Sequence, residues 1–351
     1  MDFTSNDYLG MATFPPPSHS SAPSAASSSR PAPGSSGSRL LSGNAPLHEA
    51  FESSFGRLVS SPHNLLFNSG YVANLSVLSS LPQPGDVLLL DEQVHNSVWS
   101  GVKMCRATDI RTFRHNDAED FRRKLGEIPP GTHVMAVVEG YYSMSGEVAP
   151  VGDLVSVANE VRSRAESDVR LVVDEAHSSG VFNGGGGVWP PPRGGDDAVL
   201  ASVHAFGKAY GSFGAVACFG CEEVKDCVVN FAKPFIYTTS LPPSHVEALG
   251  GQVDGVFGKE GERRRARLFE NVREYQALTG SKLPGPIQFV PMRSAEEALE
   301  CQGRMRESGY DVKAVRPPTI EKSGLRVVLH SFNELEDIKG LVSAIHDGLR
   351  K

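Results

Sequence analysis

The segment Arg170–His177, RLVVDEAH, decides the fold class of this chain. It opens with a short apolar run that shows no alternation and ends on the acid Asp174. Such a run is typical of a strand in a parallel sheet, buried on both faces. An acid at the carboxyl end of that strand lies where open α/β sheets bind ligands. Taken alone, however, Asp174 could equally cap the helix that follows.

Similar apolar runs lie on both sides of this segment and alternate with helical patterns from residue 47 onward. We expect strands at 64–68, 86–90, 133–139, 170–174, 199–203 and 214–219, and helices at 47–58 and 71–81. This alternation predicts an α/β domain built on a mostly parallel sheet.

The pattern changes after Pro242-Pro243. There we expect one long polar helix over 244–279, then strands at 287–291, 313–316 and 325–329 and helices at 295–308 and 334–349. Near the other end, residues 15–38 are rich in Pro, Ser, Ala and Gly and cannot bury enough apolar surface to fold alone. We therefore predict an N-terminal arm and connector over 1–38, a large domain over 39–243 and a small α+β domain over 244–351.

Composition excludes several classes of protein. A chain of 351 residues exceeds what one hydrophobic core usually serves. Its net charge of −7 and scattered basic residues predict no nucleic-acid and no membrane partner. The five cysteines include a single CxxC pair, which favours reduced thiols over a metal site. No apolar run reaches membrane-span length and no signal-peptide pattern is present, so we expect a cytoplasmic protein.

A lysine follows a second strand end in the segment Ser202–Ala209, SVHAFGKA. A lone lysine there is usually solvated, but one with a lowered pKa can form imines with carbonyl compounds. Together, Lys208 and the upstream Asp174 suggest pyridoxal 5′-phosphate (PLP). The lysine would hold the aldehyde, and the acid would keep the pyridine nitrogen protonated.

Two further motifs fit the same cofactor. The turn Asn68-Ser69-Gly70-Tyr71 opens a helix whose N-terminus could bind a phosphate, although SG is mainly a turn signal. His95 comes just after another strand and could stack on the cofactor ring. It could equally be a loop histidine with no such task.

These motifs stand among others in the order typical of the α-oxoamine synthase family of PLP fold-type I enzymes, which the chain resembles over nearly its whole length. No single motif is specific, but ten or more in fixed order are. The resemblance implies a PLP-dependent transferase fold with a mostly parallel seven-stranded sheet. The matching stretches are SNDYLG (5–10), GSSGSRLLSG (34–43), FNSGYVAN (67–74), DEQVHNS (91–97), RHND (114–117), EGYYSMSGEVAP (139–150), VVDEAHSSG (172–180), HAFGKAYG (204–211), FIYTTSLPP (235–243), RPPT (316–319) and GLRVVL (324–329).

The resemblance also implies a role for each matching position. Lys208 would carry the cofactor as an imine and later remove the α-proton of the substrate. Asp174 would pair with the pyridine nitrogen, His177 with the ring hydroxyl oxygen, and His95 would stack on the ring. The remaining implied contacts are Gly70, Tyr71 and Ser143 with the cofactor, Thr238 or Thr239 with the phosphate of a homodimer partner, Arg326 with the amino-acid carboxylate, and Thr319 with the acyl substrate.

Within the family, RPPT, SRLLSG and the FGKA form of the lysine loop favour the 8-amino-7-oxononanoate synthases of biotin biosynthesis. The implied reaction is a decarboxylative condensation of L-alanine with pimeloyl-CoA or a pimeloyl acyl-carrier protein. Three other branches share this chemistry: 5-aminolevulinate synthase, glycine C-acetyltransferase and serine palmitoyltransferase. A non-catalytic scaffold of the same fold is the remaining alternative.

The lysine loop departs from the family at one position. Ala205 stands where many relatives have a threonine that contacts the phosphate or a hydroxyl. The neighbouring His204 is either a replacement contact or an ordinary packed histidine.

Overall fold

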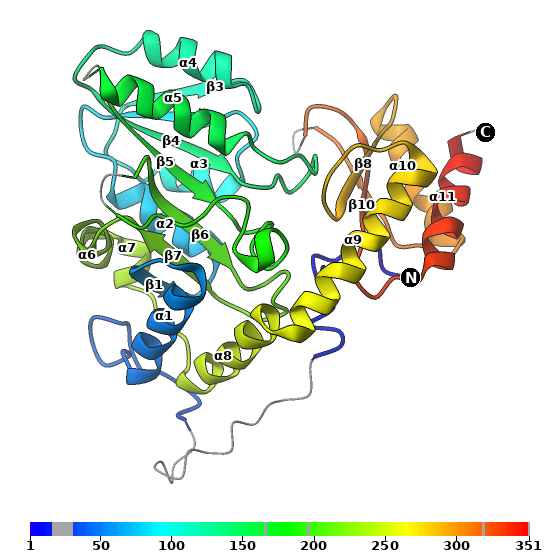
Figure 1. Cartoon of the computed structure of the whole chain (residues 1–351), viewed down its shortest axis with the longest axis horizontal. Coiled ribbons are helices and arrows are strands. Elements are labelled where there is room, and N and C mark those ends of the chain that lie inside the picture. Colours follow the sequence, from blue (N-terminus) through cyan, green and yellow to red (C-terminus); the bar gives the residue numbers. More distant parts are fainter. Residues whose placement is uncertain (16–30, 165–166, 195–196, 318–319, 350–351) are drawn as a thin grey trace.

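A computed structural model describes residues 1–15, 31–164, 167–194, 197–317 and 320–349 of the chain. It has two lobes, one built on a seven-stranded sheet and one on a three-stranded sheet. Figure 1 shows the long diagonal formed by α8 and α9, which connects the two lobes, and both chain ends beside the smaller one.

The larger sheet has the strand order β1-β7-β6-β5-β4-β2-β3. β2 to β6 pair in parallel, whereas β7 runs antiparallel to both of its neighbours, β6 and β1. The predicted α/β class with a mostly parallel seven-stranded sheet is thus confirmed. The strands are β1 (His63–Phe67), β2 (Val87–Asp91), β3 (Asp109–Phe113), β4 (His133–Glu139), β5 (Asp168–Asp174), β6 (Val199–Ala205) and β7 (Ala215–Phe219).

Helices cover both faces of this sheet. Leu88 and Leu90 of β2 pack with residues of α2, α3 and α7, whereas Val87 and Leu89 pack with α4 and α5. Because successive residues of a strand point to opposite faces, a strand covered on both sides is apolar throughout. The helices of this lobe are α1 (Pro46–Val59), α2 (Gly70–Ser80), α3 (Asn96–Val102), α4 (Ala118–Gly126), α5 (Val151–Ser163), the short η1 (Asn183–Gly185), α6 (Glu222–Phe231) and α7 (Lys233–Ile236).

The predicted single helix over 244–279 is wrong at one point. Two helices occupy the range, α8 (Pro243–Phe257) and α9 (Lys259–Thr279), and Gly258 between them has extended backbone. At Gly261 an added Cβ would lie 1.9 Å from the Val256 carbonyl oxygen, so only glycine permits the close approach after the break.

The smaller lobe follows as an antiparallel sheet of order β8-β10-β9, packed against helices. Its elements are β8 (Ile287–Pro291), α10 (Ala295–Glu307), β9 (Lys313–Val315), β10 (Gly324–Val328) and α11 (Leu335–Leu349). Across the described ranges of the chain, no helix combines the length and the apolar character needed to cross a membrane.

The N-terminal residues 1–15 lie against this smaller lobe. Phe3 accepts a backbone hydrogen bond from Val328 of β10, and Tyr8 accepts one from Ser331. Phe3 and Tyr8 are fully buried, as is Met11. The start of the chain therefore packs beside a sheet formed some 300 residues later, while the predicted division at residues 38 and 243 stays a prediction.

Candidate active site

The carboxyl ends of the parallel strands bring the predicted residues to one edge of the large sheet. β2, β4 and β5 end in Asp91, Glu139 and Asp174, and Glu139 pairs directly with Asp174 in the strand register. β6 ends at Ala205, three residues before Lys208. A row of three acids thus lies next to the loop that carries the lysine.

The first turn of α2 reaches the same edge. Phe67 at the end of β1 and Ala205 at the end of β6 both pair with Ala215 of β7. Gly70 follows Phe67 closely, and an added Cβ there would lie 3.1 Å from the Cβ of Ala205. The free N–H groups at the start of α2 therefore lie beside the lysine loop, where a phosphate would be bound.

Lys208 is partly enclosed by this edge. Burial lowers the pKa of its ammonium group, although the negative charges of Asp174 and Glu139 act in the opposite direction. A lowered pKa increases the fraction of free amine, which is the form that reacts with an aldehyde.

Asp174 is buried and held by two donors. Its Oδ1 accepts from the backbone N–H of Ala176 at 2.9 Å, and its Oδ2 accepts from Asn74 Nδ2 at 2.7 Å. Each carboxylate oxygen has further lone-pair capacity. Asp174 can therefore keep its orientation and still accept a hydrogen bond from a ring nitrogen.

His95 is connected to Asp174 through two side chains. Asn74 also donates to Ser97 Oγ at 2.9 Å, and Ser97 Oγ lies 2.8 Å from His95 Nδ1. The backbone N–H of Ser97 donates to the same Nδ1 at 3.1 Å, so this nitrogen is an acceptor. Desolvation and the charge of Lys208 lower the pKa of His95, against the pull of Asp174, which favours the neutral ring with its proton on Nε2.

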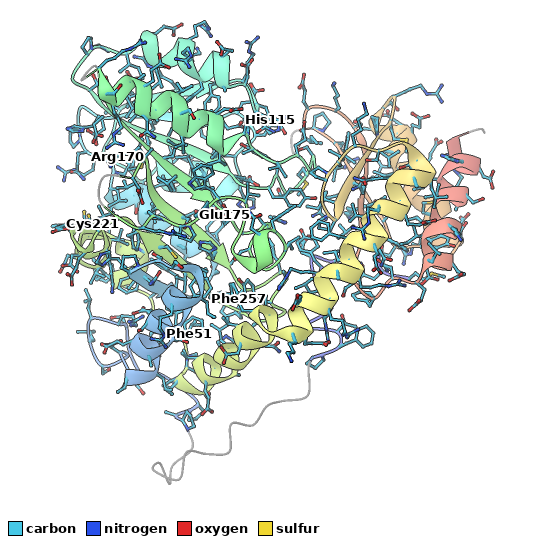
Figure 2. All side chains as sticks on the ribbon, in the orientation of Figure 1. Phe51, His115, Arg170, Glu175, Cys221 and Phe257 are labelled. Carbon is cyan, nitrogen blue, oxygen red and sulfur yellow. The ribbon has the colours of Figure 1, made fainter. Side chains whose placement is uncertain are left out.

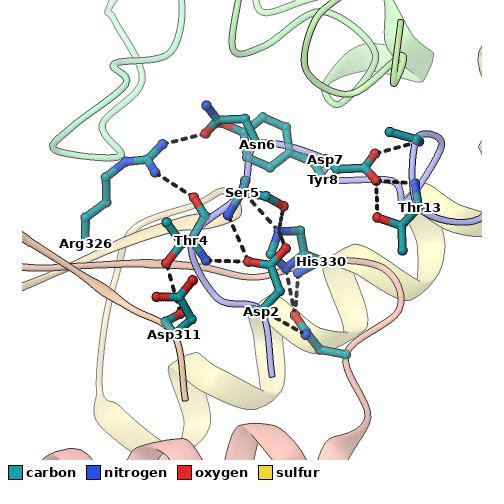
Figure 3. A network of polar contacts seen from close by, with 12 residues as sticks. Asp2, Thr4, Ser5, Asn6, Asp7, Tyr8, Thr13, Asp311, Arg326 and His330 are labelled. Atoms are coloured by element: carbon teal, nitrogen blue, oxygen red, sulfur yellow. Dashed lines mark hydrogen bonds and ion pairs between the residues drawn. The ribbon is translucent and has the colours of Figure 1, made fainter. Parts of the chain in front are cut away.

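Arg326 and His177 meet the N-terminal arm on the side of the smaller lobe. Figure 3 shows the Arg326 guanidinium beside Asn6, whose Oδ1 it reaches with Nη2 at 2.8 Å. Arg326 Nε also donates to the Ser143 carbonyl oxygen at 2.7 Å. His177 Nδ1 lies 2.6 Å from the hydroxyl of Tyr8.

The question of His204 is settled by its surroundings. The ring is fully buried, with Nδ1 3.1 Å from Ser179 Oγ and Nε2 2.9 Å from Ser202 Oγ. Burial lowers the pKa of His204 to about 3. It is an ordinary packed histidine, and it does not replace the threonine that is missing at Ala205.

Four predicted residues lack a contact that would test their roles. Tyr71 is exposed, and its hydroxyl donates to Ser100 Oγ. Thr238 Oγ1 donates to the Pro234 carbonyl oxygen at 2.5 Å, and the backbone oxygen of Thr239 accepts from Asn68. Thr319 lies outside the described residues. Their proposed contacts with cofactor and substrate stay predictions.

Several polar residues of the site were not predicted, although all lie inside quoted motifs. Glu139 is buried, with Oε2 accepting from the Ser143 N–H and Oε1 without a hydrogen-bond partner among the described residues. Burial and the charge of Asp174 raise the pKa of Glu139 well above its usual range, so it is a neutral acid. Their polar character inside these motifs was the one signal that could have identified them as site residues. The residues are Asn6, Tyr8, Asn74, Ser97 and Glu139.

A cavity of about 640 Å³ opens between the two lobes, near this edge. Gln93, His115 and Glu147 line it from the large lobe, and Tyr275 and Phe289 line it from the small one. Figure 2 shows His115 on the side of the large lobe that faces the smaller sheet. The volume is in the range of small-molecule sites.

The assembled groups fit PLP. A lysine with a lowered pKa, an orientated carboxylate with unused lone pairs and a neutral histidine match its aldehyde, pyridine nitrogen and ring hydroxyl. Ser69 caps the N–H of Val72, and the first N–H groups of α2, at Gly70 and Tyr71, match its phosphate. Over the residues that the structure covers, no cluster of three or more potential metal ligands is found.

Comparison with known proteins gives concordant results. Residues 1–345 match the family model described as aminotransferase class I and II. The 8-amino-7-oxononanoate synthase of Methylococcus capsulatus is 35% identical, over 99% of this chain and 89% of that protein.

Two solved structures share the fold over almost the whole chain. The 8-amino-7-oxononanoate synthase of Francisella tularensis is 25% identical with a TM-score of 0.79, covering 100% of this chain and 98% of that one. A serine palmitoyltransferase of S. paucimobilis, with PLP and myriocin bound, is 25% identical with a TM-score of 0.84, covering 99% and 87%. The chain therefore belongs to the aminotransferase class I and II family and, within it, to the PLP-dependent α-oxoamine synthases, which are acyltransferases.

Proposed function

We propose that this enzyme condenses L-alanine with a pimeloyl thioester of CoA or acyl-carrier protein. The α-carbon of alanine forms a bond to the thioester carbonyl carbon, the thiol leaves, and the alanine carboxylate departs as CO2. The product is 8-amino-7-oxononanoate, a precursor of biotin. One observation carries the proposal: Lys208 and Asp174 lie at the same sheet edge, in a chain whose curated relatives are named 8-amino-7-oxononanoate synthases.

Arg326 is proposed to bind the amino-acid carboxylate. Its guanidinium is buried and bonded to neutral oxygens of Asn6 and Ser143. Among the described residues it has no acidic partner, so its positive charge is free for an incoming carboxylate. Arg suits this role because its planar fork can donate two parallel hydrogen bonds.

Lys208 is proposed to remove the α-proton of the bound amino acid and to return a proton after CO2 leaves. Its free amine, favoured by the lowered pKa, is the form that can act as a base. PLP, when bound, supplies the electron sink that stabilises the resulting carbanion. Asp174, orientated by Asn74, keeps the pyridine nitrogen protonated, and His95 covers the ring.

The acyl substrate is proposed to enter through the cavity between the lobes. Its apolar wall includes Phe289 and Pro291, which suit a methylene chain, and Lys322 adds a positive charge. Ile320 also lines the cavity and follows Thr319, the residue predicted to contact this substrate.

We also propose that the enzyme is a cytoplasmic homodimer. Two large apolar side chains that are close in sequence to Thr238 and Thr239 are exposed: Phe231 is 69% exposed and Tyr237 80%. A partner subunit would cover them, and the hydroxyls of the two threonines would serve its phosphate. Sedimentation velocity that gives the mass of a single chain at micromolar concentration would count against the dimer.

A different pair of substrates is the competing function, because a serine palmitoyltransferase shares the fold with a TM-score of 0.84. The holoenzyme should be incubated with alanine, glycine or serine in all combinations with pimeloyl-, succinyl-, acetyl- and palmitoyl-CoA. Mass spectrometry of the amino ketone identifies the pair, and a Lys208→Ala variant is the control for uncatalysed reaction. Turnover of another pair with none for alanine and a pimeloyl thioester would refute the proposal.

A further inference from the structure

Tyr8 of the N-terminal arm and His177 of the large lobe form one buried pair. The Tyr8 hydroxyl lies 2.6 Å from His177 Nδ1. The arm cannot slide along the smaller lobe, because Phe3 and Tyr8 are each tied by backbone hydrogen bonds to Val328 and Ser331. The phenol therefore reaches His177 from a fixed direction.

The pair contains two exchangeable protons in total. Burial and the positive charges of Lys208 and Arg326 lower the pKa of His177 well below its usual range, so the ring is neutral and carries one proton. Burial raises the pKa of the Tyr8 phenol, which therefore keeps its own. In the hydrogen bond between them, one group must donate and the other must accept.

Two distances favour one direction. O–H donors form bonds of roughly 2.5 to 3.0 Å, whereas bonds from N–H donors are roughly 2.7 Å or longer. The 2.6 Å separation fits donation from Tyr8 to His177 Nδ1. The reverse arrangement would leave Tyr8 to donate to Asn6 Oδ1, which is 3.3 Å away and already accepts from Arg326 at 2.8 Å.

We propose that Tyr8 fixes His177 as the tautomer with its proton on Nε2, so that His177 donates to the ring hydroxyl oxygen of PLP. Nε2 has no hydrogen-bond partner within the described part of the chain, which leaves it available to the cofactor. Tyr8 acts through His177 and is a positioning residue. The inference rests on the contact proposed for His177.

The tautomer can be measured directly in the holoenzyme. Histidine labelled with ¹⁵N gives separate chemical shifts for Nδ1 and Nε2, and the His177 signals are those lost in His177→Asn. We expect the proton on Nε2 in the unchanged enzyme and a mixture of both tautomers in Tyr8→Phe. A proton on Nδ1 in the unchanged enzyme would overturn the inference, and this measurement needs no variant in which Tyr8 is altered.

The absorption of bound PLP gives an independent readout. A donor on the ring oxygen makes that oxygen less basic, so losing the donor should raise the apparent pKa of the visible band. In Tyr8→Phe we expect the proton affinity of the cofactor to rise on the order of threefold to tenfold, the usual effect of one lost hydrogen bond. The matched control is Tyr310→Phe, which removes a hydroxyl from another ring that contacts the arm, at Phe3. It should leave the band unchanged.

A third variant, His177→Ala, distinguishes the role of Tyr8 from the proposed contact of His177 with PLP, on which that role rests. If His177→Ala shifts the band and Tyr8→Phe does not, the tyrosine has no such role while the proposed contact of His177 stands. If neither variant shifts the band, the contact of His177 with the ring oxygen fails and the inference fails with it. Formation of 8-amino-7-oxononanoate from alanine and pimeloyl-CoA is scored separately and tests only the overall reaction.

Discussion

Two regions of the molecule are rich in buried polar groups: the edge of the large sheet, and the joint where residues 1–15 pack against the smaller lobe. The two regions differ in how many of these groups have partners within the protein. Among the described residues, neither Lys208 nor Glu139 forms an ion pair, and Glu139 Oε1 has no partner. In the smaller lobe, Asn271 of α9 donates from one amide to the carbonyl oxygens of both His330 and Asn333, whose own side chains bond to the arm. Of the buried side-chain atoms without a hydrogen-bond partner among the described residues, Glu139 Oε1 thus lies at the sheet edge and none lies in the arm.

This contrast has a physical interpretation. A buried polar group without a partner destabilises the folded chain, so it persists only where surrounding structure enforces it. At the joint, the buried polar groups form hydrogen bonds with other groups of the protein, as expected of a rigid support. The sheet edge has the properties of a site completed by a ligand. Changes at the edge should therefore alter chemistry. Changes at the joint that spare Tyr8 and Arg326, which reach the site, should alter stability.

The largest effect is expected at Lys208. Lys208→Ala removes the only amine at the described sheet edge that can act as the base, so exchange of the α-proton of alanine should fall by about a thousandfold or more. The unfolding temperature of the apoprotein should stay close to that of the parent chain. Solvent deuterium exchange followed by proton NMR measures the rate, and exchange at the parent rate would remove Lys208 from its role.

The next largest effect is expected at Arg326, which belongs to both regions. Arg326→Lys keeps the charge but loses the fork, so the KM for the amino acid should rise about a hundredfold, equivalent to ~2.7 kcal/mol. Steady-state kinetics at saturating thioester give this value. An unchanged KM for the amino acid together with a lowered kcat would contradict the carboxylate contact.

The sequence predicted the sheet edge better than it predicted the joint. The buried strands were found within one or two residues, because residues such as those of β4 and β5 are apolar on both faces. β3 was missed because its burial alternates along Asp109–Phe113 at the edge of the sheet, where polar and apolar residues mix. The break at Gly258 was missed because a single glycine does not end a helical pattern by itself.

The same difference applies within the site. Lys208 and Asp174 stand in recognisable local motifs that follow strands, and parallel strands bring their carboxyl ends together. Tyr8 and His177 are 169 positions apart, and nothing in either segment indicates the other. A pair of this kind depends on how the arm packs on β10, which is a property of the folded chain and not of a motif.

A smaller effect is expected at the joint, where the change is Asn271→Ala and the quantity measured is stability. Asn271→Ala removes both amide donors and leaves the carbonyl oxygens of His330 and Asn333 buried without them. The free energy of unfolding should fall by about 2 to 3 kcal/mol, while the absorption of bound PLP stays unchanged. Urea unfolding followed by circular dichroism measures the first quantity. A shifted PLP band at unchanged stability would break the contrast between the two regions.

The smallest effect concerns His115, which lines the cavity from the large lobe. Burial lowers the pKa of His115, but hydrogen bonds to Asp91 at 2.9 Å and to Glu147 at 3.1 Å outweigh it and raise the pKa to about 9. A raised pKa means that the folded chain binds this proton more tightly than the unfolded chain does. The resulting stability is complete below about pH 6.5, the usual pKa of histidine, and is lost as the pH rises through 9.

The free energy of unfolding should therefore decrease by about 2 kcal/mol between pH 6.5 and 9.5, after allowance for solvent screening of a partly exposed group. In His115→Gln this part of the pH dependence should vanish. The difference between the two titrations isolates His115, because all other groups titrate in both proteins. Parallel curves would show that folding does not raise the pKa of His115. Of these two side chains at the cavity wall, Lys322 would then carry a positive charge in this pH range and His115 would not.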